Sequence, residues 1–184
     1  GTLWRYLDPD GGSDVVVFYS GHGVPGLRDR QAYLLPVDAD PNNPEINGYP
    51  VEVLYQNLSR LKAPSVAVFL DACFSGESQK GMLIRATSGI SVTPRMPKAS
   101  ARLAVLTAAR GDQVASWDEN ARYGLFTHHL LNALYGAADR GRDGNKDGKI
   151  TLGETKSYLG RHMTRAARRK FGRIQNATVI GDEK

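Results

Sequence analysis

The sequence predicts an α/β fold in which helices flank a mostly parallel central sheet, and three observations support this prediction. Apolar, β-branched runs of strand length occur at residues 14–19, 65–70 and 101–107. Segments with helical spacing of apolar residues, at 50–62 and 124–138, alternate with these runs. The first two runs stop at small and polar residues, as strands do at the carboxyl edge of an open sheet. Strands that alternate with helices form a parallel sheet covered on both faces.

The composition is that of one soluble globular domain without disulfide bonds. A chain of 184 residues can bury a core as a single domain, and 41% hydrophobic and 23% charged residues are ordinary values for such a protein. The one cysteine, Cys73, cannot form an internal disulfide, so we expect a reducing compartment, the cytoplasm. No apolar run reaches the roughly 18 residues that span a membrane, and we expect no membrane partner.

The net charge of +5 is concentrated in one segment. Residues 156–173 contain seven Lys and Arg side chains and no acid, so the rest of the chain is net negative. Such a segment would suit nucleic acid or another acidic partner. The segment also has apolar residues at helical spacing, which is typical of a helix with one solvated face. We favour the solvated helix and expect no nucleic-acid partner.

Short elements surround the first two strands. Residues 1–7 resemble the end of a helix, and turn residues then predict a loop before the first strand. A glycine-containing loop at 21–30 leads to a short strand at 32–37 and then to a loop rich in Pro and Asn. The helix predicted at 50–62 ends before Pro64, which cannot continue it.

A long loop separates the second and third strands. Residues 77–100 show little periodicity, and loops of this length are usually functional or disordered. The remaining predicted elements, in chain order, are a strand at 101–107, a short edge strand at 114–118, a helix at 124–138, a helix at 152–171 and a last strand at 177–180.

Two residues with reactive side chains each follow an apolar strand. Cys73 follows the second strand, and His22 follows the first, between Gly21 and Gly23. A cysteine nucleophile needs a neighbour that takes its proton and a donor for the leaving amine, and imidazole does both near neutral pH. Taken singly, the cysteine could be a small buried hydrophobe and the histidine a turn residue. Because Cys73 and His22 both follow strand ends and lie 51 positions apart, together they indicate a catalytic pair.

Two motifs surround these residues. S-G-H-G at 20–23 and D-A-C-F-S-G at 71–76 each follow an apolar strand. With them, the sequence resembles the caspase-like cysteine peptidase clan, and within it the bacterial metacaspase-like (orthocaspase) branch. The similarity continues at 107–115, 124–131 and 175–182, so it covers most of the chain.

The resemblance implies the caspase-like (caspase-hemoglobinase) three-layer fold and a cysteine endopeptidase. It implies that Cys73 is the nucleophile, that His22 is the general acid/base, and that the N–H groups of Gly23 and Cys73 form the oxyanion hole. Relatives are commonly monomeric, so we expect a monomer. They also have a strand and a helix before the strand at 14–19. We therefore expect residues 1–184 to be the C-terminal portion of the domain, with an unpaired sheet edge and an N-terminal fragment of the same protein as a partner.

Acidic residues near the predicted site indicate which substrate residue precedes the cleaved bond. By resemblance, caspases that cut after Asp carry Gln two positions before the nucleophile and Arg after a Ser-Trp pair. Here Asp71 and Asp118 stand at those positions. Two acids in place of these residues favour Arg or Lys before the scissile bond. We expect Ser20 and Trp117 to line the same pocket.

Both acids have an alternative interpretation. Asp71 could be a strand-end carboxylate that caps nearby N–H groups, and Asp118 could be an exposed loop charge, with Asp112 and Glu119 as alternative acids. A peptidase that cuts after basic residues could also process itself in the long loop. The basic residues of that loop are Lys80, Arg85, Arg95 and Lys98.

Residues 143–154 match the EF-hand calcium loop along their full length. Carboxylate or amide oxygens stand at loop positions 1, 3 and 5, glycine at position 6 and glutamate at position 12. The predicted ligands are Asp143, Asn145, Asp147, the carbonyl of Lys149, Thr151 and Glu154. We therefore predict structural or regulatory Ca²⁺ that takes no part in catalysis. The alternative is a glycine-rich helix connection with solvated acids.

Together these observations predict a cytoplasmic cysteine endopeptidase that cleaves after Arg or Lys and is capable of self-processing. The alternative is a catalytically silent caspase-like module that binds calcium and acts in interaction or signalling.

Overall fold

The computed structural model describes residues 3–8, 10–78, 81–83, 93–100, 102–118 and 122–183. The central sheet has the strand order β1-β5-β8-β11. It confirms the predicted α/β fold with a mostly parallel sheet, because only the last strand is antiparallel. The strands are β1 (Val15–Ser20), β5 (Val66–Asp71), β8 (Leu103–Thr107) and β11 (Thr178–Ile180).

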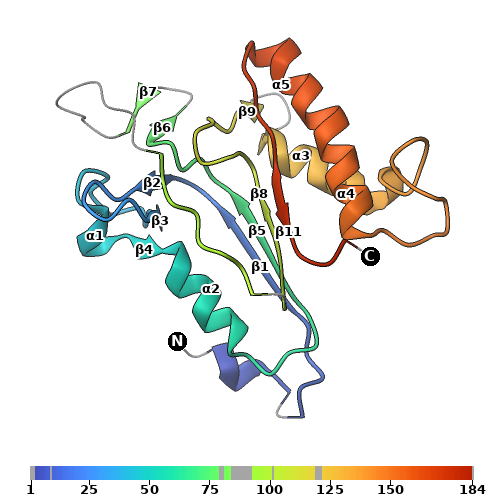
Figure 1. Cartoon of the computed structure of the whole chain (residues 1–184), viewed down its shortest axis with the longest axis horizontal. Coiled ribbons are helices and arrows are strands. Elements are labelled where there is room, and N and C mark those ends of the chain that lie inside the picture. Colours follow the sequence, from blue (N-terminus) through green and yellow to red (C-terminus); the bar gives the residue numbers. More distant parts are fainter. Residues whose placement is uncertain are drawn as a thin grey trace.

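Helices cover the sheet from two sides (Figure 1). Helix α2 (Val51–Ser59) packs on one face, in a core that contains Val68 and Leu70 of β5. Helix α3 (Leu125–Asn132) packs on the other face, in a second core that includes Phe69. Neighbouring residues of β5 thus enter opposite cores, which is why the strand is apolar from Val66 to Leu70.

The C-terminal helix extends over residues 152–171, as predicted. It consists of α4 (Leu152–Tyr158), the π-helical segment η3 (Leu159–Met163) and α5 (Thr164–Phe171). Its first turn carries a capping box, and Gly172, in the left-handed conformation, ends it. The predicted apolar side is buried, through Leu159, Met163 and Ala167. The helix predicted at 124–138 is shorter. It begins as α3, and within the segment η2 (Ala133–Ala137) the backbone of Tyr135 and Gly136 is not helical, with Gly136 at a φ of 103°.

The smaller elements lie around the sheet. The strand predicted at 32–37 is shorter and belongs to a three-stranded antiparallel sheet. Helical turns occur near the N-terminus and in the loop rich in Pro and Asn. These elements are η1 (Leu3–Tyr6), β2 (Gly23–Pro25), β3 (Ala32–Leu34), α1 (Pro44–Asn47), β4 (Tyr49–Pro50), β6 (Glu77–Ser78) and β7 (Gly81–Met82).

The edge strand predicted at 114–118 is wrong. Only its end is extended, as β9 (Trp117–Asp118), and this pairs with β10 (Tyr123–Gly124) in a small hairpin outside the central sheet. The N–H groups of Ala115 and Ser116 donate to the side chains of Cys73 and Gln175, so they are not available for a strand ladder. The Ser116 carbonyl accepts the Leu125 N–H at 2.8 Å, next to the hairpin.

Strand β1 is the outermost strand of the central sheet within the described residues, in agreement with the predicted unpaired edge. Val16 and Phe18 point away from the α2 core and are 69% and 53% exposed. The N-terminal fragment expected as a partner stays a prediction.

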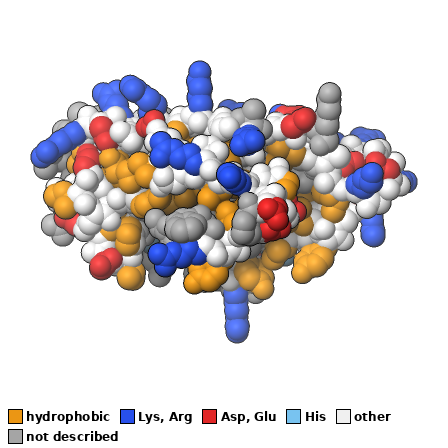
Figure 2. Space-filling model, turned by 90° about the horizontal axis from the view of Figure 1, so that it is seen from below, with side chains coloured by type: hydrophobic (Ala, Val, Ile, Leu, Met, Phe, Trp, Pro, Cys, Tyr) orange, Lys and Arg blue, Asp and Glu red, His pale blue; other side chains and the backbone are white. Residues whose placement is uncertain are grey.

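The surface in Figure 2 shows how charges are distributed on one face. Lys and Arg side chains project at separate points there and lie among Asp and Glu side chains. This face therefore carries no single basic patch. Among the described residues, no helix has the length and apolar character needed to cross a bilayer.

Candidate active site

The parallel pairing of β1 and β5 aligns the two predicted catalytic residues. Ser20 is the register partner of Asp71 at the paired strand ends. One residue further, the Gly21 N–H donates to the Asp71 carbonyl at 3.2 Å. His22 and Cys73 each lie two positions past this last pair, on chains that run about 5 Å apart while the ladder lasts. The predicted pocket residue Ser20 is exposed at the same edge.

The backbone after His22 packs directly on the backbone of Cys73. A Cβ atom at Gly23 would lie only 2.6 Å from the Cys73 carbonyl oxygen and 2.6 Å from the Phe74 ring. Glycine is therefore needed for this approach. The Tyr19 hydroxyl donates to the His22 carbonyl at 2.8 Å, and so fixes the turn that carries the imidazole.

The Cys73 thiol is covered by another segment of the chain. Its Sγ accepts the Ala115 N–H at 2.8 Å and donates to the Ala115 carbonyl at 3.5 Å. Burial raises the pKa of Cys73 to about 11, against which the Ala115 N–H lowers it, while the nearby Asp71 charge raises it further. The His22 imidazole is exposed, and within the described residues both hydrogen bonds of the sulfur go to Ala115.

Asp71 is buried at the start of α3. Its side chain is 7% exposed and accepts hydrogen bonds from the hydroxyl and the backbone N–H of Thr127. Burial raises the pKa of Asp71, and the Thr127 hydrogen bonds oppose that shift. The carboxylate also lies against Gly124, where a side chain would clash with it. Asp71 thus makes the capping contact of the alternative interpretation, and its role in substrate binding stays a prediction.

The hairpin β9–β10 contains the second predicted acid, Asp118, and contacts the first, Asp71. Asp118 is 6% exposed and forms a salt bridge of 2.7 Å with Lys170 of α5. Its strand neighbour Trp117 is half exposed and pairs with Gly124, the residue that touches Asp71. The hairpin is therefore held between the end of β5 and the C-terminal helix.

The acids that were alternatives to Asp118 differ from it in position. The interpretation of Asp118 as an exposed loop charge is wrong, because its carboxylate is buried and paired. Asp112 is exposed in the segment between β8 and the hairpin. Glu119 lies outside the described residues.

Several residues that shape this site could not be recognised from the sequence. Ala115 covers the thiol through its backbone, which any residue except proline could do, so no sequence signal marks it. Thr127 and Tyr19 act through hydroxyl groups inside apolar stretches, where a single polar atom is easily overlooked. Lys170 belongs to the basic segment, and nothing in the sequence separates this one cation from its solvated neighbours.

Comparison with known proteins agrees with this geometry. The model of the caspase domain family matches residues 2–159, which is most of the chain. The chain belongs to the caspase domain family. It is therefore a cysteine peptidase of the caspase clan that acts on proteins, as the resemblance implied, while the metacaspase-like branch stays a prediction. A search of curated proteins finds none that matches the chain.

The first and last predicted calcium ligands, Asp143 and Glu154, make their hydrogen bonds with different parts of the chain. Asp143 accepts a hydrogen bond from Ser157 at 3.0 Å and contacts Arg161 and His162 at 3.4 and 3.1 Å. Glu154 accepts N–H groups of the loop itself, as the second half of the capping box. Among the described residues, no three His, Cys, Asp or Glu side chains gather closely enough to hold a metal ion.

The middle of this loop is folded around its own backbone. Asn145 and Asp147 accept backbone N–H groups two residues further on, at Asp147 and Lys149. The Lys149 N–H and the side-chain amide of Asn145, which donates to the Asp147 carboxylate at 3.0 Å, lower the pKa of Asp147. The buried Asp139, which lies before the predicted loop, accepts the N–H groups of Asp147 and Gly148 at 3.2 and 2.9 Å. Sequence analysis missed it because it stands four positions ahead of the motif.

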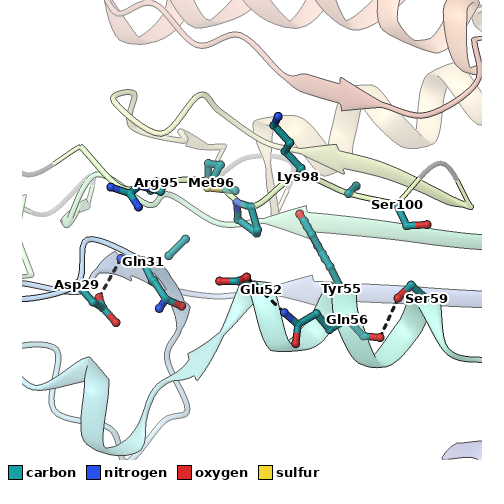
Figure 3. A pocket seen from close by; sticks show the side chains of 13 residues that line it. Asp29, Gln31, Glu52, Tyr55, Gln56, Ser59, Arg95, Met96, Lys98 and Ser100 are labelled. Atoms are coloured by element: carbon teal, nitrogen blue, oxygen red, sulfur yellow. Dashed lines mark hydrogen bonds between the residues drawn. The ribbon is translucent and has the colours of Figure 1, made fainter.

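A separate pocket of about 690 Å³ lies between α2, residues 29–32 and residues 95–100 (Figure 3). Neither Cys73 nor His22 lines it. The carboxylates of Asp29 and Glu52 lie on one side of it, with Arg95 and Lys98 on the segment across from them. These charges of both signs indicate no single class of ligand, so the pocket does not help to define the substrate.

Proposed function

We propose that this caspase domain is a cysteine endopeptidase that cleaves after Arg or Lys, with Cys73 and His22 as its catalytic pair. The observation that carries the proposal is the register of β1 and β5, which gives the two residues equivalent positions beyond neighbouring parallel strands. The packing of Gly23 against the Cys73 carbonyl supports it further, because it keeps the two chains together after the ladder ends.

In the proposed mechanism, the thiolate of Cys73 attacks the peptide carbonyl. His22 takes the thiol proton, gives it to the leaving amine and then activates water for deacylation. The N–H groups of Gly23 and Cys73 stabilise the oxyanion. The raised pKa of the buried thiol makes the base necessary, since at neutral pH the sulfur is protonated.

We also propose that Asp71 and Asp118 select the basic side chain. Both carboxylates are buried, where a cation gains more from an opposite charge than it does in water. Asp118 is paired with Lys170 in the free protein, so a basic substrate side chain would have to share or replace that partner. Arginine would be preferred to lysine if both carboxylates accept its guanidinium.

The test of the proposed function is cleavage of fluorogenic peptides that end in Arg, Lys or Asp. We expect the Arg and Lys peptides to be cleaved, and the Cys73→Ala and His22→Ala variants to lose at least about 1,000-fold in kcat/KM, because each removes a reacting group. Cleavage of the Asp peptide instead would contradict the proposed specificity. Undiminished cleavage in Cys73→Ala would contradict the proposed nucleophile.

Replacing Asp71 by Asn separates the effect of its charge on substrate binding from the effect of its hydrogen bonds to Thr127. An amide oxygen can still accept from Thr127, so we expect the free energy of unfolding in urea to change by less than about 1 kcal/mol. Loss of the charge should reduce kcat/KM for Arg and Lys peptides by about 100-fold, which corresponds to about 2.7 kcal/mol. Asp10→Asn, which changes an exposed acid in the loop before β1, is the control. Equal kcat/KM in the wild type and in both variants would mean that Asp71 only caps α3 and does not bind substrate.

Self-processing is proposed for the long loop before β8. Arg95 is a poor site there, because its backbone is held by the Arg30 carbonyl at 2.6 Å and by a bridge to Gln31. Lys98 is exposed, whereas Lys80 and Arg85 lie outside the described residues. We expect mass mapping to find fragments that end at Lys80, Arg85 or Lys98 in the wild type and none in Cys73→Ala. The same fragments in both preparations would rule self-cleavage out.

The alternative, a silent caspase-like module, is favoured by one observation. The Cys73 sulfur is hydrogen-bonded to Ala115 instead of the predicted base. An enzyme therefore needs a shift of that segment, and a silent module does not.

Calcium binding at residues 143–154 is a further proposal, supported by oxygen donors of the type that calcium prefers. It requires Asp143 to leave Ser157 and its basic neighbours. Calcium at 100 times its dissociation constant should then stabilise the fold by about 2.7 kcal/mol, seen as a rise in Tm. Glu154→Gln, which loses the bidentate carboxylate of position 12 but can still form the capping box, should abolish the rise, whereas the exposed Asp10→Asn should keep it. An unchanged Tm in the wild type would contradict the site.

A further inference from the structure

Gln175 is a fully buried polar side chain in the turn between α5 and β11. It stands outside the stretch that the caspase family model matches, and the proposed mechanism does not use it. Its Oε1 accepts the Ser116 N–H at 2.9 Å, and its Nε2 donates to the Ala108 carbonyl at 3.0 Å. A neutral amide is suited to such a bridge because it carries an acceptor and donors on one rigid group.

The bridge closes the segment of residues 108–116, which we call the covering segment. The segment begins where β8 ends, and its first N–H, at Ala108, donates to the Leu70 carbonyl of β5. Near its other end, Ala115 makes both hydrogen bonds to the Cys73 sulfur. The Gln175 amide is therefore attached to the residue directly after the one that touches the thiol.

The turn that carries Gln175 is itself fixed. The Thr164 hydroxyl of α5 donates to the Gln175 carbonyl at 3.0 Å, and the Asn176 N–H donates to the Gln113 side chain at 2.8 Å. The C-terminal helix thus acts as a rigid support from which one amide determines where the covering segment lies.

We propose that Gln175 is a positioning residue for Cys73: its amide holds the covering segment so that the Ala115 peptide group lies on the sulfur. The inference rests on the proposed function only in taking Cys73 as the nucleophile. It assigns Gln175 a role that reaches the reacting atom through Ser116 and Ala115.

The position of the segment has two opposite effects on the thiol. It removes water from the sulfur, which disfavours the thiolate, and it offers the Ala115 N–H, which favours the thiolate. Burial is the larger effect, and it holds the pKa of Cys73 at about 11. Releasing the segment should therefore lower the pKa towards that of an ordinary thiol and increase the reactivity of the sulfur near neutral pH.

The same residue fixes the wall of the proposed pocket. Ser116, which Gln175 holds, directly precedes the hairpin strand of Trp117 and Asp118. Loss of the amide should therefore disturb substrate binding while it uncovers the thiol. Faster alkylation together with slower peptide cleavage would be the combined result. General unfolding would also expose the thiol, so a variant that loses another buried hydrogen bond is needed as a control.

The experiment compares the rate of alkylation by iodoacetamide between pH 7 and pH 11 in the wild type and in Gln175→Met, which is similar in length but cannot bridge. Cys73 is the only cysteine, so the readout is specific to the site. We expect the rate at pH 8 to rise by at least 10-fold in the variant, and its apparent pKa to fall by one unit or more. Unchanged rate and pKa would overturn the proposal.

A matched control is Thr155→Val, which removes another buried hydrogen bond, from the Thr155 hydroxyl to the Thr151 carbonyl at 3.0 Å, away from the covering segment. Equal alkylation profiles in both variants would reduce Gln175 to a structural role. Gln175→Glu keeps the acceptor for Ser116 and loses the donor to Ala108. It tests the proposal by the same profile if Gln175→Met does not fold, and a profile like that of the wild type would again overturn it. A shifted profile without any peptide cleavage by the wild type would refute the proposed function and leave the positioning role intact.

Discussion

The site depends above all on the parallel pairing of β1 with β5. Their register ends at the pair Ser20 and Asp71, and this pair determines where His22 and Cys73 lie, two residues further along each chain. A slip of one residue would turn every side chain of β5 to the opposite core. The slip is prevented because Val68 and Leu70 are buried against α2 while Phe69 belongs to the other core. Apolar packing on two faces thus fixes where two short polar loops emerge.

Around the strand ends, several polar side chains are buried. Asp71, Asp118 and Gln175 are all largely withdrawn from water, and each is compensated by a specific partner. Thr127 compensates the first, Lys170 the second, and the covering segment the third. The first two bonds join the end of β5 and the hairpin to α3 and α5. The third joins the covering segment to the turn after α5, so the site is held by these elements as well as by the strands.

The sequence was sufficient for the strands and helices with strong periodicity and for the two loops that carry His22 and Cys73. These features follow from local pattern, and strand ends in a parallel sheet meet at one edge. The sequence was not sufficient at residues 114–118, where a short apolar run suggested an edge strand. There the outcome depends on long-range bonds to Cys73 and Gln175, which periodicity does not encode. It was also not sufficient for the orientation of Asp143, which depends on the basic residues of a following helix.

These contacts separate the placement of the nucleophile from its availability. The strands bring Cys73 to the same edge as His22, but the covering segment determines whether its sulfur is hydrated and can lose its proton. The cost of moving this segment is set by a few hydrogen bonds near the thiol, two between Ala115 and the Cys73 sulfur and two that join Ser116 to Gln175 and Leu125, each worth about 1 kcal/mol in net terms. A bound peptide could offset that cost through the backbone groups that it occupies. Substrate binding and exposure of the thiol would then be one event, governed from α5 through Gln175.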